Sequence, residues 1–195
     1  NAGTDTSINF LGTTDNTPLM FRLNNQPFGR LDYEKRSIFL GRASGKKVTF
    51  PGASDNIFIG DSAGYNYTGA ESSILIGTKT GFKSNGSGWN VFIGEEAGMS
   101  TTRYGNVFVG HQAGKNSIGT PATISLNTYI GHTAGLSDSI GYANTLIGGR
   151  TREKTKEGAY NTMVGAMAGN SAEKSDGNTL MGYSSGQYIG GSYNT

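Results

Sequence analysis

Two pentapeptides of this chain have the spacing of a serine-nucleophile turn. They are residues 60–64 (GDSAG) and 182–186 (GYSSG), and both match the G-x-S-x-G pattern that places a serine between a strand and a helix in many hydrolases. No helical periodicity follows either serine, and both belong to a longer phrase that recurs along the chain. In the other copies the serine position holds Ala43, Lys79, Glu96, Gln112, Thr133, Arg150 and Met167. We therefore expect a variable outward position there and no catalytic residue.

Two histidines and two glutamates are the other candidates for chemistry. His111 and His132 occupy the same position of consecutive copies of the phrase, where stacked imidazoles could approach a metal ion. No acidic third ligand stands at that position in either copy, so we expect two solvated histidines and no metal. Glu95 and Glu96 are adjacent and would point apart on a strand, whereas polysaccharide cleavage needs two carboxylates about 5 to 10 Å apart. No cofactor is expected, because the chain has no Cys and no phosphate-binding loop.

The composition argues against a helical domain. The 195 residues include 32 Gly, only 34% hydrophobic residues and 15% charged residues, and each glycine weakens a helix by about 1 kcal/mol relative to Ala. The net charge of +2 is small and evenly spread, so neither nucleic acid nor an anionic membrane is expected as a partner. No apolar run is long enough to span a membrane, and no membrane insertion is expected.

A nine-residue phrase with a period of 17 dominates the sequence. Numbered from one to nine, it reads NVFIGEEAG at residues 90–98, with Gly at position five in every copy. Nine copies begin at Ser37, Asn56, Ser73, Asn90, Asn106, Asn127, Asn144, Asn161 and Asn178. The period lengthens by four residues between Gly110 and Gly131, through residues 117–122, where we expect a loop to bulge out. The seventh copy ends in Arg152 instead of Gly, inside a mixed-charge run over residues 150–157.

Each phrase predicts a short strand followed by a tight turn. Positions two to four are β-branched, aromatic or long aliphatic residues, as strands favour. Side chains alternate across a strand, so positions two and four face one way and position three the other, and both faces are apolar. Seventeen residues suit one rung of a parallel β-solenoid, whose rungs pair about 4.8 Å apart, so nine rungs make a rod about 40 Å long. Such a thin coil covers one strand face, and another copy of the chain would cover the second. Asn at position one in seven of nine copies predicts a stacked amide ladder.

The repeats resemble those of a known group of fibres. The N-x-F-I-G-x-x-A-G phrase is similar to repeats in trimeric fibrous surface proteins, namely trimeric autotransporter adhesin heads and, more closely, tail-fibre-like proteins of phages and contractile injection systems. Residues 8–16 and 18–23, followed by residues 29–32 (GRLD), resemble the segment that precedes such repeats in fibre-like proteins of Bacteroidetes-type bacteria. The resemblance implies an elongated parallel homotrimer. Adhesin heads repeat in a shorter unit, so their rung geometry is not transferred to this chain.

The expected organisation is a cap followed by a repeat array. Residues 1–34 are predicted to form a separate β-hairpin cap or connector that turns at residues 24–27 (NNQP). Residues 35–195 are predicted to form the solenoid. The chain ends on residues 192–195 (SYNT), which is how a further repeat would begin, so we expect the array to be truncated at this end.

Aromatic residues outside the strands are the candidate binding residues. Exposed aromatic rings stack on sugar faces and dominate contacts at protein interfaces, although a ring at a rung corner can equally pack across a subunit boundary. Those between the phrases are Tyr65, Tyr67, Phe82, Trp89, Tyr104, Tyr142, Tyr160, Tyr183, Tyr188 and Tyr193. Trp89 is the first to test, because it follows the flexible stretch of residues 85–88 (NGSG). The binding residues selected are Trp89, Tyr65, Tyr67 and Tyr104 together with Arg150 and Arg152 of the mixed-charge run.

The expected function is attachment without chemistry. An extracellular trimeric fibre, on a cell surface or a phage-like particle, would bind a receptor or a glycan through avidity, with baseplate components as its other partners. Two alternatives stay open: a polysaccharide-degrading solenoid enzyme and an ice-binding protein. The second is suggested by a column of Thr at position two (Thr128, Thr145, Thr162 and Thr179), although its exposure is doubtful if Ile130, Ile147, Val164 and Met181 on the same face are buried.

Overall fold

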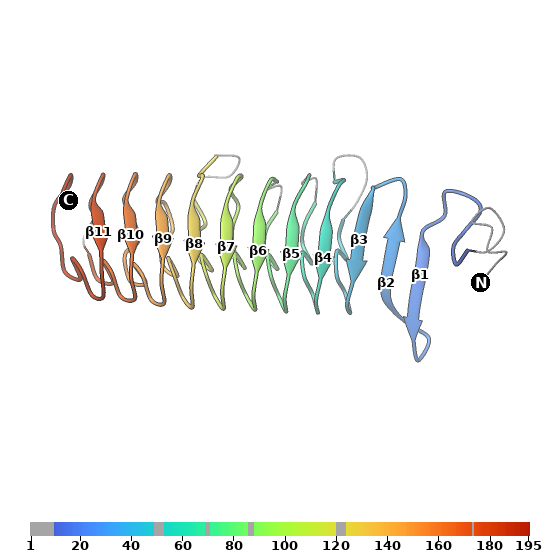
Figure 1. The fold of residues 1–195 in the computed structure, drawn as a ribbon. Coiled ribbons are helices and arrows are strands. Elements are labelled where there is room, and N and C mark those ends of the chain that lie inside the picture. Colours follow the sequence, from blue (N-terminus) through green and yellow to red (C-terminus); the bar gives the residue numbers. More distant parts are fainter. Residues whose placement is uncertain (1–9, 49–52, 69–70, 86–87, 120–123, 173) are drawn as a thin grey trace, which may run out of the picture.

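The chain forms a parallel β-solenoid closed at one end by a hairpin (Figure 1). The computed structural model describes residues 10–48, 53–68, 71–85, 88–119, 124–172 and 174–195, and this part is all-β, with no helix. Its eleven strands follow one another in a single sheet in chain order. They are β1 (Leu19–Leu23), β2 (Gln26–Asp32), β3 (Ser37–Leu40), β4 (Ile57–Ile59), β5 (Ile74–Ile76), β6 (Val91–Ile93), β7 (Val107–Val109), β8 (Thr128–Ile130), β9 (Thr145–Ile147), β10 (Thr162–Val164) and β11 (Thr179–Met181).

The predicted 17-residue rung is confirmed. Strands β3 to β11 pair in parallel and in register, so each position of one phrase lies beside the same position of the next. The turns that follow the strands are stacked as well. The amide of Gly64, for example, donates to the carbonyl of Thr80 in the next coil, and the amide of Gly81 to that of Ala97. Backbone polar groups at the corners therefore find partners in neighbouring coils, although the strands themselves are only three or four residues long.

Position three of the phrase fills the interior of the solenoid. Its residues are buried in every coil, and the aromatic ones contact one another from coil to coil: Phe92 stacks on Phe108 at 4.9 Å between ring centroids, and Phe108 on Tyr129 at 4.8 Å. The column comprises Phe39, Phe58, Leu75, Phe92, Phe108, Tyr129, Leu146, Met163 and Leu180. Small residues at position eight, such as Ala63 and Ala97, are buried against it. The core is thus thin, because most of it is the position-three side chain of each coil and the small residue at position eight.

Two glycine positions make this thin core possible. At position nine, a Cβ on Gly64 would lie 2.5 Å from the ring carbons of Phe58, and the residue has a φ of 59°. At position five, a Cβ on Gly94 would lie 2.5 Å from the carbonyl oxygen of Gly110 in the next coil, at a φ of 129°. Both backbone conformations favour glycine, and both sites have no room for a methyl group. The invariant glycine of the phrase is therefore required by close approach as well as by the turn.

Replacing Gly64 with Ala should destabilise the protein by about 2–5 kcal/mol, because the left-handed conformation and the clash with Phe58 add. Gly149→Ala is the matched control: no atom lies within 4 Å of the added Cβ, and its φ is not in the left-handed region. The control should change the free energy of unfolding by less than about 0.5 kcal/mol. Chemical denaturation of both variants measures the difference, and equal stabilities would contradict the packing role of position nine.

The predicted amide ladder is present at position one. The side-chain oxygen of each Asn accepts the backbone amide of position one in the next coil, as between Asn90 and Asn106 at 2.8 Å and between Asn144 and Asn161 at 3.0 Å. Ser37 and Ser73 use their hydroxyl oxygens in the same way. The pattern continues to Asn194, whose amide donates to Asn178. These side chains are buried, so the ladder replaces water as the partner of the backbone at this corner.

The hairpin β1–β2 precedes the first coil. Its turn is Asn24 and Asn25, both with positive φ, as the two-residue turns of twisted hairpins require. Strand β2 then pairs antiparallel with β3 over four residue pairs, so the hairpin is continuous with the solenoid sheet and not a separate unit. The loop expected over residues 117–122 lies partly outside the described residues, as does part of the stretch over residues 85–88.

Candidate functional site

The outer face of the sheet is uncovered and carries an apolar residue at position four in every coil. Positions two and four point away from the core, and their side chains are half-buried or exposed in every coil. Ile59, Ile93, Ile130 and Ile147 at position four are each 37% or 38% exposed, which is high for aliphatic side chains in the centre of a strand. A contiguous apolar surface of this kind marks an interaction site. We call positions two and four of β3 to β11 the outer face.

The outer face continues onto the hairpin. In the antiparallel register, Leu31 lies opposite Ile38, and Leu19 opposite Leu31. Directly opposed residues share a face of the sheet, so these leucines extend the apolar column past the first coil. Leu31 is as exposed as the isoleucines of the coils, at 38%. The surface therefore runs over all eleven strands.

The threonine column lies on this face together with the aliphatic residues of position four, as expected from strand alternation. Thr128 and Thr145 are half-buried and Thr162 and Thr179 are exposed, and the aliphatic neighbour Met181 is 74% exposed. Exposure of the column was doubtful if its aliphatic neighbours were buried. In the single chain they are not, since Ile130 and Ile147 are each 38% exposed, and position three is the strand position that faces the interior.

Aromatic and aliphatic side chains, most of them exposed, line the corner before strands β6 to β10. Trp89 lies next to Tyr104, with 5.6 Å between ring centroids, and Tyr142 next to Tyr160, at 5.2 Å. Trp89 and Tyr160 immediately precede position one and have positive φ, which turns their side chains outward while the Asn that follows turns inward. We define the corner strip as Trp89, Tyr104, Ile124, Leu126, Tyr142 and Tyr160. Its members other than Tyr104 are 45% to 62% exposed.

Of the six predicted binding residues, only Trp89 and Tyr104 are brought together, in the corner strip. Tyr65 stacks on Phe82 at another corner, with 5.1 Å between ring centroids, and the ammonium groups of Lys46 and Lys47 each lie 5.5 Å from its centroid. Arg150 is exposed and its Nε donates to Glu153 at 2.9 Å. The strip members Ile124, Leu126, Tyr142 and Tyr160 were not selected, although their place just before position one was a signal available in the sequence.

Two predicted binding residues are inside the protein. Tyr67 is fully buried, its ring packs edge-on against Phe58, and its hydroxyl donates to Ser73 at 3.0 Å. The expectation that it faces outward is wrong. Tyr67 is the twelfth residue counted from position one of its phrase, and the residue at this place points into the coil in other repeats as well, for example Ser84 and Ser117. Arg152 is also fully buried. Neither side chain can reach a ligand on the surface.

Arg152 belongs to a buried polar network between two coils. Its Nη1 lies 3.3 Å from Oδ2 of Asp138, and both side chains are 0% exposed. The Tyr129 hydroxyl and the Gly141 amide also donate to the Asp138 carboxylate. Burial raises the pKa of Tyr129 well above its usual value, so the phenol stays a donor. Arg152 of the mixed-charge run therefore turns inward, where its charge opposes that of Asp138.

The catalytic candidates remain isolated. The Ser62 hydroxyl donates to Asp61 in its own turn at 2.9 Å. Glu95 and Glu96 lie in the turn after β6 and not on a strand, and the Lys115 and Gln112 side chains that donate to Glu96 hold the pKa of its carboxyl below the usual value. His111 and His132 stack at 5.1 Å between ring centroids. Within the described ranges, no group of three or more His, Asp or Glu residues could hold a metal ion.

None of the family models, curated proteins or solved structures compared with this chain matches it. Among the described residues, no helix is long and apolar enough to cross a membrane.

Proposed function

We propose that this chain is a segment of a homotrimeric extracellular fibre that attaches a particle or a cell to a surface receptor or glycan. The uncovered outer face is the observation that carries the proposal. It repeats at the strand spacing over nine coils, so a second copy of the chain presents the same apolar residues at the same spacing.

Three copies around a common axis are supported by the resemblance of the repeats to trimeric surface fibres. In such an arrangement each chain turns its outer face inward, and the isoleucines of position four are removed from water. Burial of apolar surface contributes about 25 cal/mol per Å², and the contribution grows with every coil. A long stack of coils is thus favoured over a short one in the assembled fibre.

The corner strip is the proposed attachment surface. Paired rings such as Trp89 with Tyr104 and Tyr142 with Tyr160 offer flat apolar faces for the rings of sugars. Each strip would bind weakly, but three strips on one rigid fibre bind a repetitive glycan surface together, with an effective concentration set by the fibre geometry. The function proposed is recognition, with no catalysed reaction.

The mass of the purified protein in solution tests the assembly. Light scattering or sedimentation should give three times the chain mass of 20.5 kDa. A stable monomer would overturn the fibre proposal, since the outer face would then be open to water. In that case the threonine column on β8 to β11 would stay exposed, and thermal hysteresis would be the measurement that tests ice binding. A dimer would contradict the three-fold fibre.

A further inference from the structure

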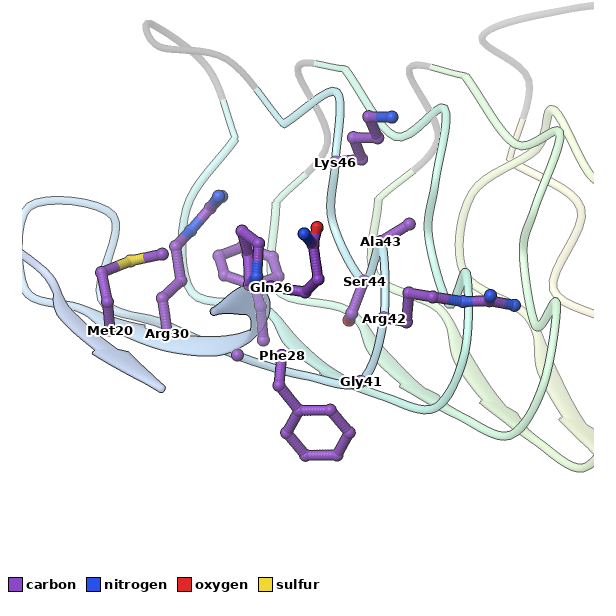
Figure 2. Close-up of a pocket in the computed structure, with 12 residues that line it drawn as sticks. Met20, Gln26, Phe28, Arg30, Gly41, Arg42, Ala43, Ser44 and Lys46 are labelled. Atoms are coloured by element: carbon purple, nitrogen blue, oxygen red, sulfur yellow. The ribbon is translucent and has the colours of Figure 1, made fainter. Parts of the chain in front are cut away.

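A cavity lies at the N-terminal end of the solenoid, between the hairpin and the first coil. Its volume is about 610 Å³, within the range of about 300–1,000 Å³ that is typical of small-molecule sites. Its lining comes from β1, β2, β3 and the turn that follows β3 (Figure 2). We call it the end cleft. It is distinct from the outer face and from the corner strip.

The end cleft is on the inner side of the sheet. Met20 lies opposite Arg30, and Arg30 opposite Phe39, so these three residues share one face. Phe39 is the first member of the buried core column. The guanidinium of Arg30 lies over its ring, at 4.3 Å from Cζ to the centroid. The cleft is therefore the place where the core of the solenoid opens between the hairpin and the first coil, with Met20 and Phe39 as apolar walls.

The charge in the end cleft is positive and incompletely balanced. Arg30, Arg42 and Lys46 line it, and no lining residue is acidic. Arg42 is paired with Asp61 at 2.7 Å. Within the described part of the chain, the acidic partner of Arg30 is Asp32, at 3.5 Å, and Asp32 is shared with Lys35 at the same distance. Figure 2 shows Arg30 beside Met20 at the hairpin end of the cleft and Lys46 at the other end, on the first coil.

Arg30 also has unused hydrogen-bond donors. Its Nε and Nη2 atoms are buried and have no hydrogen-bond partner among the described residues. Burial lowers the pKa of the Arg30 guanidinium, and the neighbouring Asp32 carboxylate only partly opposes this effect. Buried donors without partners are costly and rare in folded proteins. An oxyanion that enters the cleft would supply both the missing acceptors and the missing charge.

We propose that the end cleft binds a small organic anion, in which a carboxylate group pairs with Arg30 and Lys46 while an apolar body rests against Met20 and Phe39. Arginine is suited to this role because its planar guanidinium donates two parallel hydrogen bonds to a carboxylate. The apolar walls explain why the ligand is an amphiphile and not a bare inorganic anion. This site depends on the hairpin and the first coil and does not depend on the proposed trimer.

Fluorine NMR with para-trifluoromethylphenylacetate as the probe tests the proposal on the whole chain in its own assembly state. The carboxylate should bind saturably, with a dissociation constant of about 1 mM or tighter. The neutral amide of the same acid and inorganic phosphate should each bind at least about tenfold more weakly. The amide lacks the negative charge, and phosphate lacks the apolar body. Equal binding of the acid and the amide would overturn the proposal, as would no saturation at about 10 mM probe.

Three variants locate the site. Arg30→Gln and Lys46→Gln should each weaken binding of the carboxylate, Arg30→Gln by about tenfold or more. Arg36→Gln is the control, because Arg36 pairs with Asp55 and does not line the cleft. If Arg30→Gln lowers the melting temperature, Lys46→Gln still decides the question. Lys46 is exposed, so this change removes a cation of the cleft without disturbing the buried core. Unchanged binding in both cleft variants would place the probe elsewhere and overturn the assignment, whatever the mass of the assembly.

Discussion

Ile93→Asp is expected to convert the assembled protein into monomers of 20.5 kDa. Ile93 stands at the centre of the outer face, in β6. In the trimer the substitution buries one carboxylate from each chain without a partner, at an effective cost of several kcal/mol per ion, and it places like charges near a common axis. In the monomer the same side chain is 38% exposed, so the carboxylate stays hydrated and the coil keeps its fold.

Thr78→Asp is the matched control for this prediction. Thr78 is exposed in the turn that follows β5, outside the outer face, and the aspartate there should leave the trimer intact. Sedimentation of both variants at one concentration gives the masses, and circular dichroism checks that the fold is retained. A trimer that survives Ile93→Asp would show that the outer face is not the interface.

The second prediction concerns the buried ion pair. Asp138→Ser and Arg152→Gly should each destabilise the protein by about 3–5 kcal/mol, because each leaves the opposite charge buried without its partner. The double variant should recover most of this loss. It gives both positions residues that other coils already use: Ser117 is buried at the position of Asp138, and Gly135 stands at the position of Arg152.

Recovery in the double variant has two physical causes. The double variant leaves no buried charge without a partner, whereas each single variant does. Glycine also suits the backbone at this site, since Arg152 has a φ of 48°. Urea unfolding of the four proteins at a fixed concentration completes the cycle. If the two single losses simply add in the double variant, Asp138 and Arg152 are not coupled, and the role given to the network is wrong.

The surroundings of the pair bear on the size of this effect. The Nη1 of Arg103 donates to the carbonyl of Gly141. Burial raises the pKa of the Asp138 carboxyl, and the charges of Arg152 and Arg103 oppose this rise. The Asn144 amide is a further donor, at 3.4 Å from the Asp138 carboxylate. These groups remain in the Arg152→Gly variant and support the charge of Asp138. We therefore expect Asp138→Ser to be the more destabilising of the two single changes.

The strands and their stacking could be predicted because the information is local and repeated. A glycine at position five fixes where each strand ends, and three apolar residues before it define the strand. Asn at position one predicts the ladder seen between Asn90 and Asn106. Nine copies of the same pattern leave one consistent register, since any slip would lose the glycine contacts in every coil at once.

The corners could not be predicted in the same way. Strand alternation decides the direction of side chains at positions two to four, but the residues between strands have mixed backbone conformations, including left-handed φ at non-glycine positions such as Trp89 and Tyr160. Each left-handed residue changes which of its neighbours points inward. For that reason Tyr67 and Arg152 were expected on the surface and lie in the core, whereas Tyr142 and Tyr160 form a pair that was not selected.

The sequence by itself determined the period, the strand positions, the glycine and asparagine columns and the hairpin turn, because each follows from the conformational preferences of a few neighbouring residues. Only the tertiary structure decided which apolar column fills the core and which is left on the outer face, since that depends on how narrow the closed coil is. It also decided the pairing of Asp138 with Arg152 and the end cleft around Arg30. Both arise where different segments meet in space, and no local pattern records such a meeting.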